Sequence, residues 1–132
     1  MQSEGQARSN LVRALHEYGE NYFVYAIESG STARGISDVY FMHNKRAYWI
    51  ECKLSASDTW QGSVIDFRPL QQKFLFDHYK AGGYGVVYIR SPTKHLFASI
   101  IDIDETKRII GKSVLQLNTL NVPVLMQWLE AL

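Results

Sequence analysis

Hydrophobic and polar positions along the chain follow two periods, one typical of helices and the other typical of strands. Apolar residues at positions 7, 11, 12 and 15 recur at helical spacing, so residues 4–18 are predicted to form a helix. Runs rich in aromatic and β-branched side chains predict five strands, at residues 22–27, 36–42, 47–54, 84–89 and 97–103.

Two further helices are predicted in the second half of the chain. Pro69 fits the first turn of a helix over 69–81, and Asn121 is a candidate N-cap for a helix over 122–132. The order helix, three strands, helix, two strands, helix includes a hairpin, which predicts a mixed α/β sheet with helices on its faces. Residues 54–68 form a long irregular connection, and loops of this length are often functional.

Composition excludes several classes of protein. The chain has 132 residues, 46% hydrophobic and 20% charged, as expected for one globular domain. Its net charge is +1, so any affinity for DNA has to come from local clustering of charge or from bound metal. The single cysteine excludes an intramolecular disulfide, and neither a membrane-length apolar run nor a secretory signal is visible. We therefore expect a cytoplasmic protein that does not bind membranes.

Charged residues interrupt two of the predicted strands. Side chains alternate along a strand, so Glu51 and Lys53 lie on the same face as Trp49, opposite a face of core residues. If this strand pairs with the one before it around a turn at 43–46, Asp38 comes close to Glu51. Two converging carboxylates suit Mg²⁺ or Mn²⁺, which polarise a phosphoryl oxygen and activate water. The simpler interpretation is an exposed Glu–Lys pair, and the apolar context together with Asp38 argues against it.

An ordered set of motifs resembles the PD-(D/E)xK nuclease superfamily, and within it the VRR-NUC group and the archaeal Holliday-junction resolvases. The matching segments are Gly35-Ile-Ser-Asp38, Glu51-Cys-Lys53, Arg68-Pro-Leu-Gln71 and Ala81-Gly-Gly83. One departure is Ser37, where the family usually has proline. The resemblance implies one nuclease domain over residues 1–132, with a restriction-endonuclease-like αβββαβ core and an extra C-terminal strand and helix.

The resemblance also implies roles for individual residues. Asp38 and Glu51 would bind the metal ion, together with the backbone carbonyl of Cys52. Lys53 would position the attacking water or stabilise the transition state. Gln71, at the start of the second helix, would lean towards the site and hold Lys53 or a phosphate.

The N-terminal helix of the family carries a further acid, and the chain offers three candidates for it. Glu4 lies on the helix face of Leu11 and would reach the metal through water. Glu17 and Glu20 compete with it. An equally good interpretation of Glu4 is a first-turn acid that complements the helix dipole.

DNA contacts are expected around this site. The candidates are Ser31, Thr32, Arg34, Arg68 and Lys73, because hydroxyls and cations suit phosphate oxygens. The alternative for each is an ordinary solvated side chain. Trp60, in the long connection, could stack on an unpaired base, or it could fold back over a satellite hydrophobic cluster.

The sequence therefore predicts a Mg²⁺- or Mn²⁺-dependent DNA endonuclease. With no room for a recognition domain, it is expected to read DNA shape, such as a branched junction or flap. Paired incision would need a homodimer, through the helix at 122–132 or the aromatic strands. Such a small nuclease suits a phage as well as a host. The alternatives are a catalytically silent nucleic-acid-binding or assembly module of the same fold, and a metal hydrolase acting on small phosphates.

Overall fold

The computed structural model describes residues 3–18, 23–27, 35–111 and 113–132. The strands are β1 (Phe23–Ala26), β2 (Val39–His43), β3 (Arg46–Leu54), β4 (Tyr84–Arg90), β5 (His95–Ser99) and β6 (Leu115–Leu117). The helices are α1 (Glu4–Tyr18), α2 (Gln71–Lys80) and α3 (Val122–Glu130), with a short 3₁₀ helix, η2 (Ile100–Asp102).

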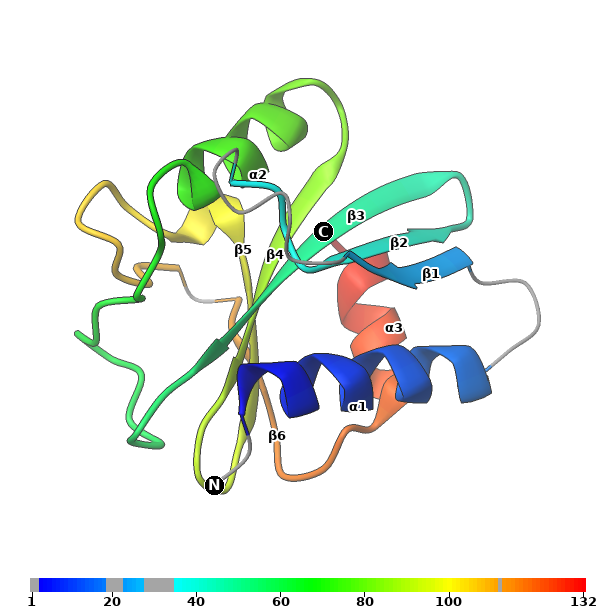
Figure 1. Cartoon of the computed structure of the whole chain (residues 1–132), viewed down its shortest axis with the longest axis horizontal. Helices are drawn as coiled ribbons and strands as arrows, with labels where there is room; N and C mark the ends of the chain where they lie inside the picture. The colour runs from blue at the N-terminus through cyan, green and yellow to red at the C-terminus, as the bar shows by residue number, and fades with distance from the viewer. Residues whose placement is uncertain (1–2, 19–22, 28–34, 112) are drawn as a thin grey trace.

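The described strands form one mixed sheet of six strands, in the order β1-β2-β3-β4-β5-β6. Strands β3 and β4 are parallel, and α2 forms the crossover that such a connection needs. All other neighbouring strands in the described sheet are antiparallel. Helices α1 and α3 cover one face of the sheet and α2 covers the other (Figure 1). This arrangement confirms the predicted α/β fold with its αβββαβ core.

Two hydrophobic clusters hold the layers together. The larger one joins α1 and α3 to the sheet through Leu11, Leu125 and the strand residues Phe41, Tyr48 and Ile50. The second lies under α2 and the loops beside it. The faces of β3 therefore divide as predicted, with Tyr48, Ile50 and Cys52 in the first cluster and Trp49 packed against the second.

The predicted hairpin is present and has a two-residue turn. Asn44 and Lys45 have φ values of 52° and 64°, as a type I′ turn requires, and His43 pairs with Arg46. The turn sets the register in which Val39 lies opposite Ile50. Asp38 and Glu51, the next residues along each strand, are thereby brought side by side.

Two predicted elements were wrong in detail, and one strand was missed. The strand expected over 97–103 ends at Ser99, whose side chain caps η2, so the chain turns there. The short edge strand β6 was missed because its three residues carry little pattern of their own. Pro69 does not open α2: Leu70 adopts a left-handed conformation (φ 74°), and the helix begins at Gln71.

The expectation for the surface of the C-terminal helix changes. The apolar stripe of α3, including Leu125 and Leu129, is buried against the sheet, so this helix does not offer a free apolar face for a dimer.

The Asn121 side chain accepts a hydrogen bond from the Val124 amide, which confirms the predicted N-cap. No helix in the described part of the chain is long and apolar enough to cross a bilayer.

Gly35 brings the loop before Asp38 into contact with the start of α2. Its φ is 72°, and a Cβ there would lie 2.3 Å from the Leu70 carbonyl oxygen and 2.8 Å from the Gln71 nitrogen. Only glycine permits this approach. The contact fixes the distance between the segment that carries Asp38 and the helix that carries Gln71.

We predict that Gly35→Ala lowers the free energy of unfolding by about 2 kcal/mol or more, because the methyl group meets backbone atoms that cannot swing aside. Gly62→Ala is the matched control: Gly62 has a φ of 75°, but a Cβ there meets nothing within 4 Å. Urea unfolding of both variants separates the close contact from the cost of the left-handed backbone. Equal losses in the two variants would contradict the assignment.

Candidate active site

Asp38 lies one residue before β2, where the β2–β3 hydrogen-bond ladder ends. Its Oδ2 atom accepts a hydrogen bond of 2.9 Å from the backbone amide of Cys52, in place of the next ladder bond. Its own carbonyl accepts a bond of 2.7 Å from the Ile27 amide. Asp38 is thus held by both neighbouring strand segments, with its carboxylate directed at β3.

Glu51, in the middle of β3, is only 1% exposed and lies beside Asp38. Its Oε2 atom accepts a hydrogen bond of 3.1 Å from the Gln71 side-chain amide, and lies 3.9 Å from the Lys53 ammonium nitrogen. Its Oε1 atom is buried and has no hydrogen-bond partner among the described residues. Among the described residues, one oxygen of this buried carboxyl group therefore accepts a hydrogen bond and the other meets no donor.

The environment of Glu51 is strongly unfavourable for its charged form. Burial is the main reason that its pKa rises to about 9, and the neighbouring Asp38 carboxylate raises it further. Lys53 acts in the opposite direction but does not compensate. Two carboxylates forced together in this way are typical of sites that hold a divalent cation.

Gln71 leans into the site from the first turn of α2, as predicted, but its amide meets Glu51 and not Lys53. Its Oε1 atom accepts a hydrogen bond of 2.7 Å from the Arg68 amide, which leaves Nε2 to donate to Glu51. The side chain is 4% exposed. Gln71 therefore fixes the orientation of the Glu51 carboxyl group.

The donor set fits a hard divalent cation. Asp38 and Glu51 contribute carboxylate oxygens, one of them without a hydrogen-bond partner in the described segments, and the backbone carbonyl of Cys52 follows directly in β3. No group of three or more His, Cys, Asp or Glu side chains in metal-binding arrangement occurs among the described residues. A cation here would thus depend on two side chains, a carbonyl and water. The Cys52 side chain itself is buried in the first hydrophobic cluster.

Helix α1 brings two charged residues, Arg8 and Glu4, to the edge of the group formed by Asp38, Glu51 and Lys53. Arg8 places Nη1 3.9 Å from Asp38 Oδ1, a contact that the sequence reasoning missed. The spacing of Glu4 and Arg8, one helical turn apart, was the available signal. Glu4 is exposed, and its charge is among the influences that raise the pKa of Glu51. Glu17 lies near the other end of α1, about 20 Å along the helix axis, and Glu20 lies outside the described residues.

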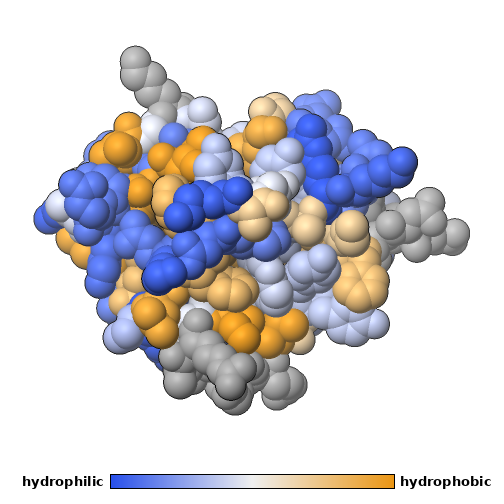
Figure 2. All heavy atoms as spheres, turned by 90° about the horizontal axis from the view of Figure 1, so that it is seen from above, coloured by the Kyte–Doolittle hydropathy of each residue, from blue (hydrophilic) through white to orange (hydrophobic). Residues whose placement is uncertain are grey.

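The structure describes two of the five residues expected to contact DNA. Ser31, Thr32 and Arg34 lie outside the described residues. Arg68 is exposed at the turn before α2, and Lys73 is exposed on α2 but pairs with Asp77. Viewed from the α2 side, hydrophilic groups form a band across the surface, with hydrophobic groups in separate patches (Figure 2).

Trp60 does not stand out from the long connection as a free stacking surface. Its ring is partly buried and packs against the second hydrophobic cluster, which is the simpler of the two interpretations considered for it. The indole nitrogen is buried without an acceptor among the described residues.

Comparison with known proteins bears on the fold. No family model matches the chain, and no curated protein matches it in sequence. Among solved structures it is similar to Hjc of Archaeoglobus fulgidus, a Holliday junction resolvase from an archaeal hyperthermophile, with a TM-score of 0.55. The match covers 88% of each chain at 13% identity. The chain therefore has the α/β fold of a restriction-endonuclease-like resolvase.

We predict that Mn²⁺ stabilises the wild-type protein and not Glu51→Gln. At a free metal concentration 100 times its Kd, the gain is about 3 kcal/mol. In Glu51→Gln one amide nitrogen replaces the unpartnered oxygen and donates to Asp38, so the metal-free variant should be more stable than wild type by about 1 kcal/mol. Thermal melts with and without Mn²⁺ measure both effects. An equal metal response in the two proteins would rule out Glu51 as a ligand.

A second prediction concerns Ser37, at a position where the nuclease family that the sequence resembles usually has proline. Its hydroxyl is fully buried and has no partner among the described residues, so Ser37→Ala should raise the free energy of unfolding by about 1 kcal/mol. The control is Ser91→Ala: Ser91 is equally buried, but its hydroxyl donates to Asp58 at 2.6 Å, so this variant should be destabilised. Denaturant unfolding gives the sign of each change.

Proposed function

We propose that the protein is a metal-dependent DNA endonuclease of the PD-(D/E)xK type, VRR-NUC-like, that selects branched DNA. The observation that carries the proposal is the buried Glu51 carboxyl group beside Asp38: one oxygen is bound by Gln71, and the other has no hydrogen-bond partner in the part of the chain that the structure describes. The fold shared with a Holliday junction resolvase supports it. Residues 1–132 form the single nuclease domain in this proposal.

Each residue of the site has a part in phosphodiester hydrolysis. Asp38, Glu51 and the Cys52 carbonyl would hold Mg²⁺ or Mn²⁺, which would supply Lewis acidity and activate water. Lys53 is 5% exposed, so its ammonium group acts in a site shielded from water and stabilises the charge that grows on the phosphate in the transition state. Gln71 holds the Glu51 carboxyl group in place.

Positive charge at the edge of the site would attract the DNA backbone. Arg8 lies beside Asp38 and is one-third exposed, and Arg68 is exposed where α2 begins. Lys73 contributes less, because Asp77 already neutralises it. The Ser31, Thr32 and Arg34 segment and Glu4 complete the proposed interface, with Glu4 acting on the metal through water.

A homodimer would allow paired cuts in a branched substrate. Because α3 is covered, the proposal for the dimer surface rests on β1 at the edge of the sheet. Phe23 and Tyr25 are 52% and 57% exposed there, and their rings pack against each other. Exposed aromatic groups on an open strand edge are typical of interaction surfaces.

We predict that the protein cuts flap, fork or four-way junction DNA in Mg²⁺ or Mn²⁺ faster than plain duplex. Asp38→Ala and Lys53→Ala should each lower the cleavage rate by about 100-fold or more, because each removes a group that acts on the transition state. Gel assays on a panel of duplex, single strand, flap, fork and junction measure the rates. If Asp38→Ala does not fold, Asp38→Asn replaces it in the assay. The asparagine side chain keeps an oxygen that accepts the hydrogen bond from the Cys52 amide.

Lys80→Ala and Glu105→Ala are the controls for this experiment, since both residues are exposed and lie outside the proposed site. Cleavage at the wild-type rate by Lys53→Ala would refute the assignment. Binding of branched DNA without cleavage in Mn²⁺ would favour the silent binding module, and hydrolysis of small phosphate esters alone would favour the small-molecule hydrolase.

A further inference from the structure

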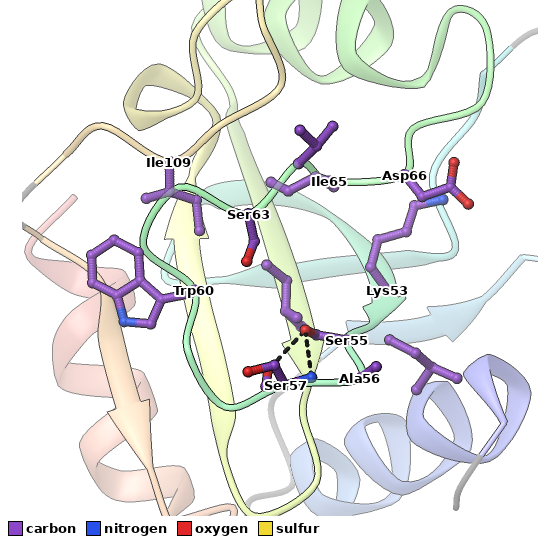
Figure 3. A pocket seen from close by; sticks show the side chains of 12 residues that line it. Lys53, Ser55, Ala56, Ser57, Trp60, Ser63, Ile65, Asp66 and Ile109 are labelled. Carbon is purple, nitrogen blue, oxygen red and sulfur yellow. Dashed lines mark hydrogen bonds between the residues drawn. The ribbon is translucent and has the colours of Figure 1, made fainter.

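A pocket of about 400 Å³ opens directly beside the proposed catalytic lysine. It lies between the end of β3 and the long connection at residues 55–66, and Lys53 forms part of its wall (Figure 3). Of the residues that line this pocket, only Lys53 has a role in the proposed hydrolysis, through its ammonium group. The other lining residues have no role in that reaction. Its size lies in the range of pockets that bind small organic groups.

The connection that forms this pocket is anchored to the rest of the protein. Asp58 accepts hydrogen bonds from the Ser91 hydroxyl at 2.6 Å and from the Thr93 hydroxyl and amide at 2.6 and 2.9 Å. These bonds lower the pKa of Asp58 to about 2. Further along, the Ile65 amide donates to the Lys107 carbonyl at 2.8 Å. The pocket is therefore formed before any ligand arrives.

The lining combines flat apolar walls with polar groups. Ile65, Ile89 and Ile109 belong to the second hydrophobic cluster and give the pocket its apolar walls. The Ser63 side chain points into the space between Ile109 and Ser55 (Figure 3). A nucleobase has matching chemistry, because its faces are apolar and its edges carry hydrogen-bond donors and acceptors.

Opposite the serines, the pocket ends at charged groups. Figure 3 shows the Lys53 and Asp66 side chains at this end of the pocket. If the Lys53 ammonium group contacts the scissile phosphate, the pocket lies next to that phosphate along the DNA strand. A second pocket, of about 480 Å³, lies under α2 beside Lys73, Asp104 and Glu105, and none of the proposed catalytic residues lines it.

We infer that the pocket beside Lys53 takes the unpaired base of the nucleotide adjacent to the scissile phosphate. This inference rests on the proposed nuclease function and narrows its substrate. A base in a duplex would have to be unstacked and unpaired before it could enter, which costs free energy. A base that is already unpaired avoids that cost. The protein therefore prefers a branch with an unpaired nucleotide, such as a flap, to a fully paired four-way junction.

The test uses a flap with one unpaired nucleotide at the branch, once with its base and once with an abasic unit in its place. We expect the wild-type protein to cut the abasic flap at least tenfold more slowly in kcat/KM. An abasic unit at a distant paired position should have no effect. Equal cleavage of the two flaps would overturn the inference without touching the nuclease assignment.

A second measurement reports on the pocket without cleavage. With 2-aminopurine as the unpaired base and EDTA present, binding of the wild-type protein should raise the fluorescence as the base leaves the stack. Ser63→Phe fills the pocket and should abolish this rise, and should cut normal and abasic flaps at one low rate. Thr119→Phe puts the same side chain at an exposed site before α3 and should behave as wild type.

The outcomes separate the two proposals. If no DNA is cut in Mg²⁺ or Mn²⁺, the nuclease function fails and the fluorescence alone decides on the pocket. If Ser63→Phe, shown to be folded by its thermal melt, gives the wild-type fluorescence rise, the base pocket is overturned. If no flap is bound at all, both proposals fail.

Discussion

The site depends on one crowded carboxyl group. Glu51 is buried next to Asp38, and within the described part of the chain only one of its oxygens accepts a hydrogen bond, from the Gln71 amide. Burial and the neighbouring carboxylate disfavour the charge of Glu51, and Lys53 compensates only in part. A folded domain gains no stability from such an arrangement. In the proposed nuclease, a bound cation would supply the missing positive charge.

The surrounding structure holds this group in place. The type I′ turn fixes the register that sets Asp38 beside Glu51, and the Asp38 side chain then replaces a ladder bond to Cys52. Gly35 allows the loop before Asp38 to touch the start of α2, from which Gln71 reaches Glu51. Each of these contacts limits movement of the site, as required for catalysis by positioning and electrostatics.

Much of the site was predictable because it depends on strand periodicity. Alternation along β3 separated Glu51 and Lys53 from the core residues Ile50 and Cys52, and the hairpin brought Asp38 into range. The elements with weak local pattern were less accessible: β6 is only three residues long, and Ser99 turns the chain by capping η2. These features depend on neighbours that are distant in the sequence.

The sequence by itself determined the order of the helices and of the first five strands, the two faces of β3 and the three charged residues of the candidate site, since these follow from local periodicity and residue chemistry. Only the tertiary structure decided that Arg8 reaches Asp38 and that Gln71 binds Glu51 and not Lys53. It also decided that α3 is covered and that a pocket forms beside Lys53. The physical reason is that these features arise from packing between segments that are far apart in the chain, and no local pattern records that packing.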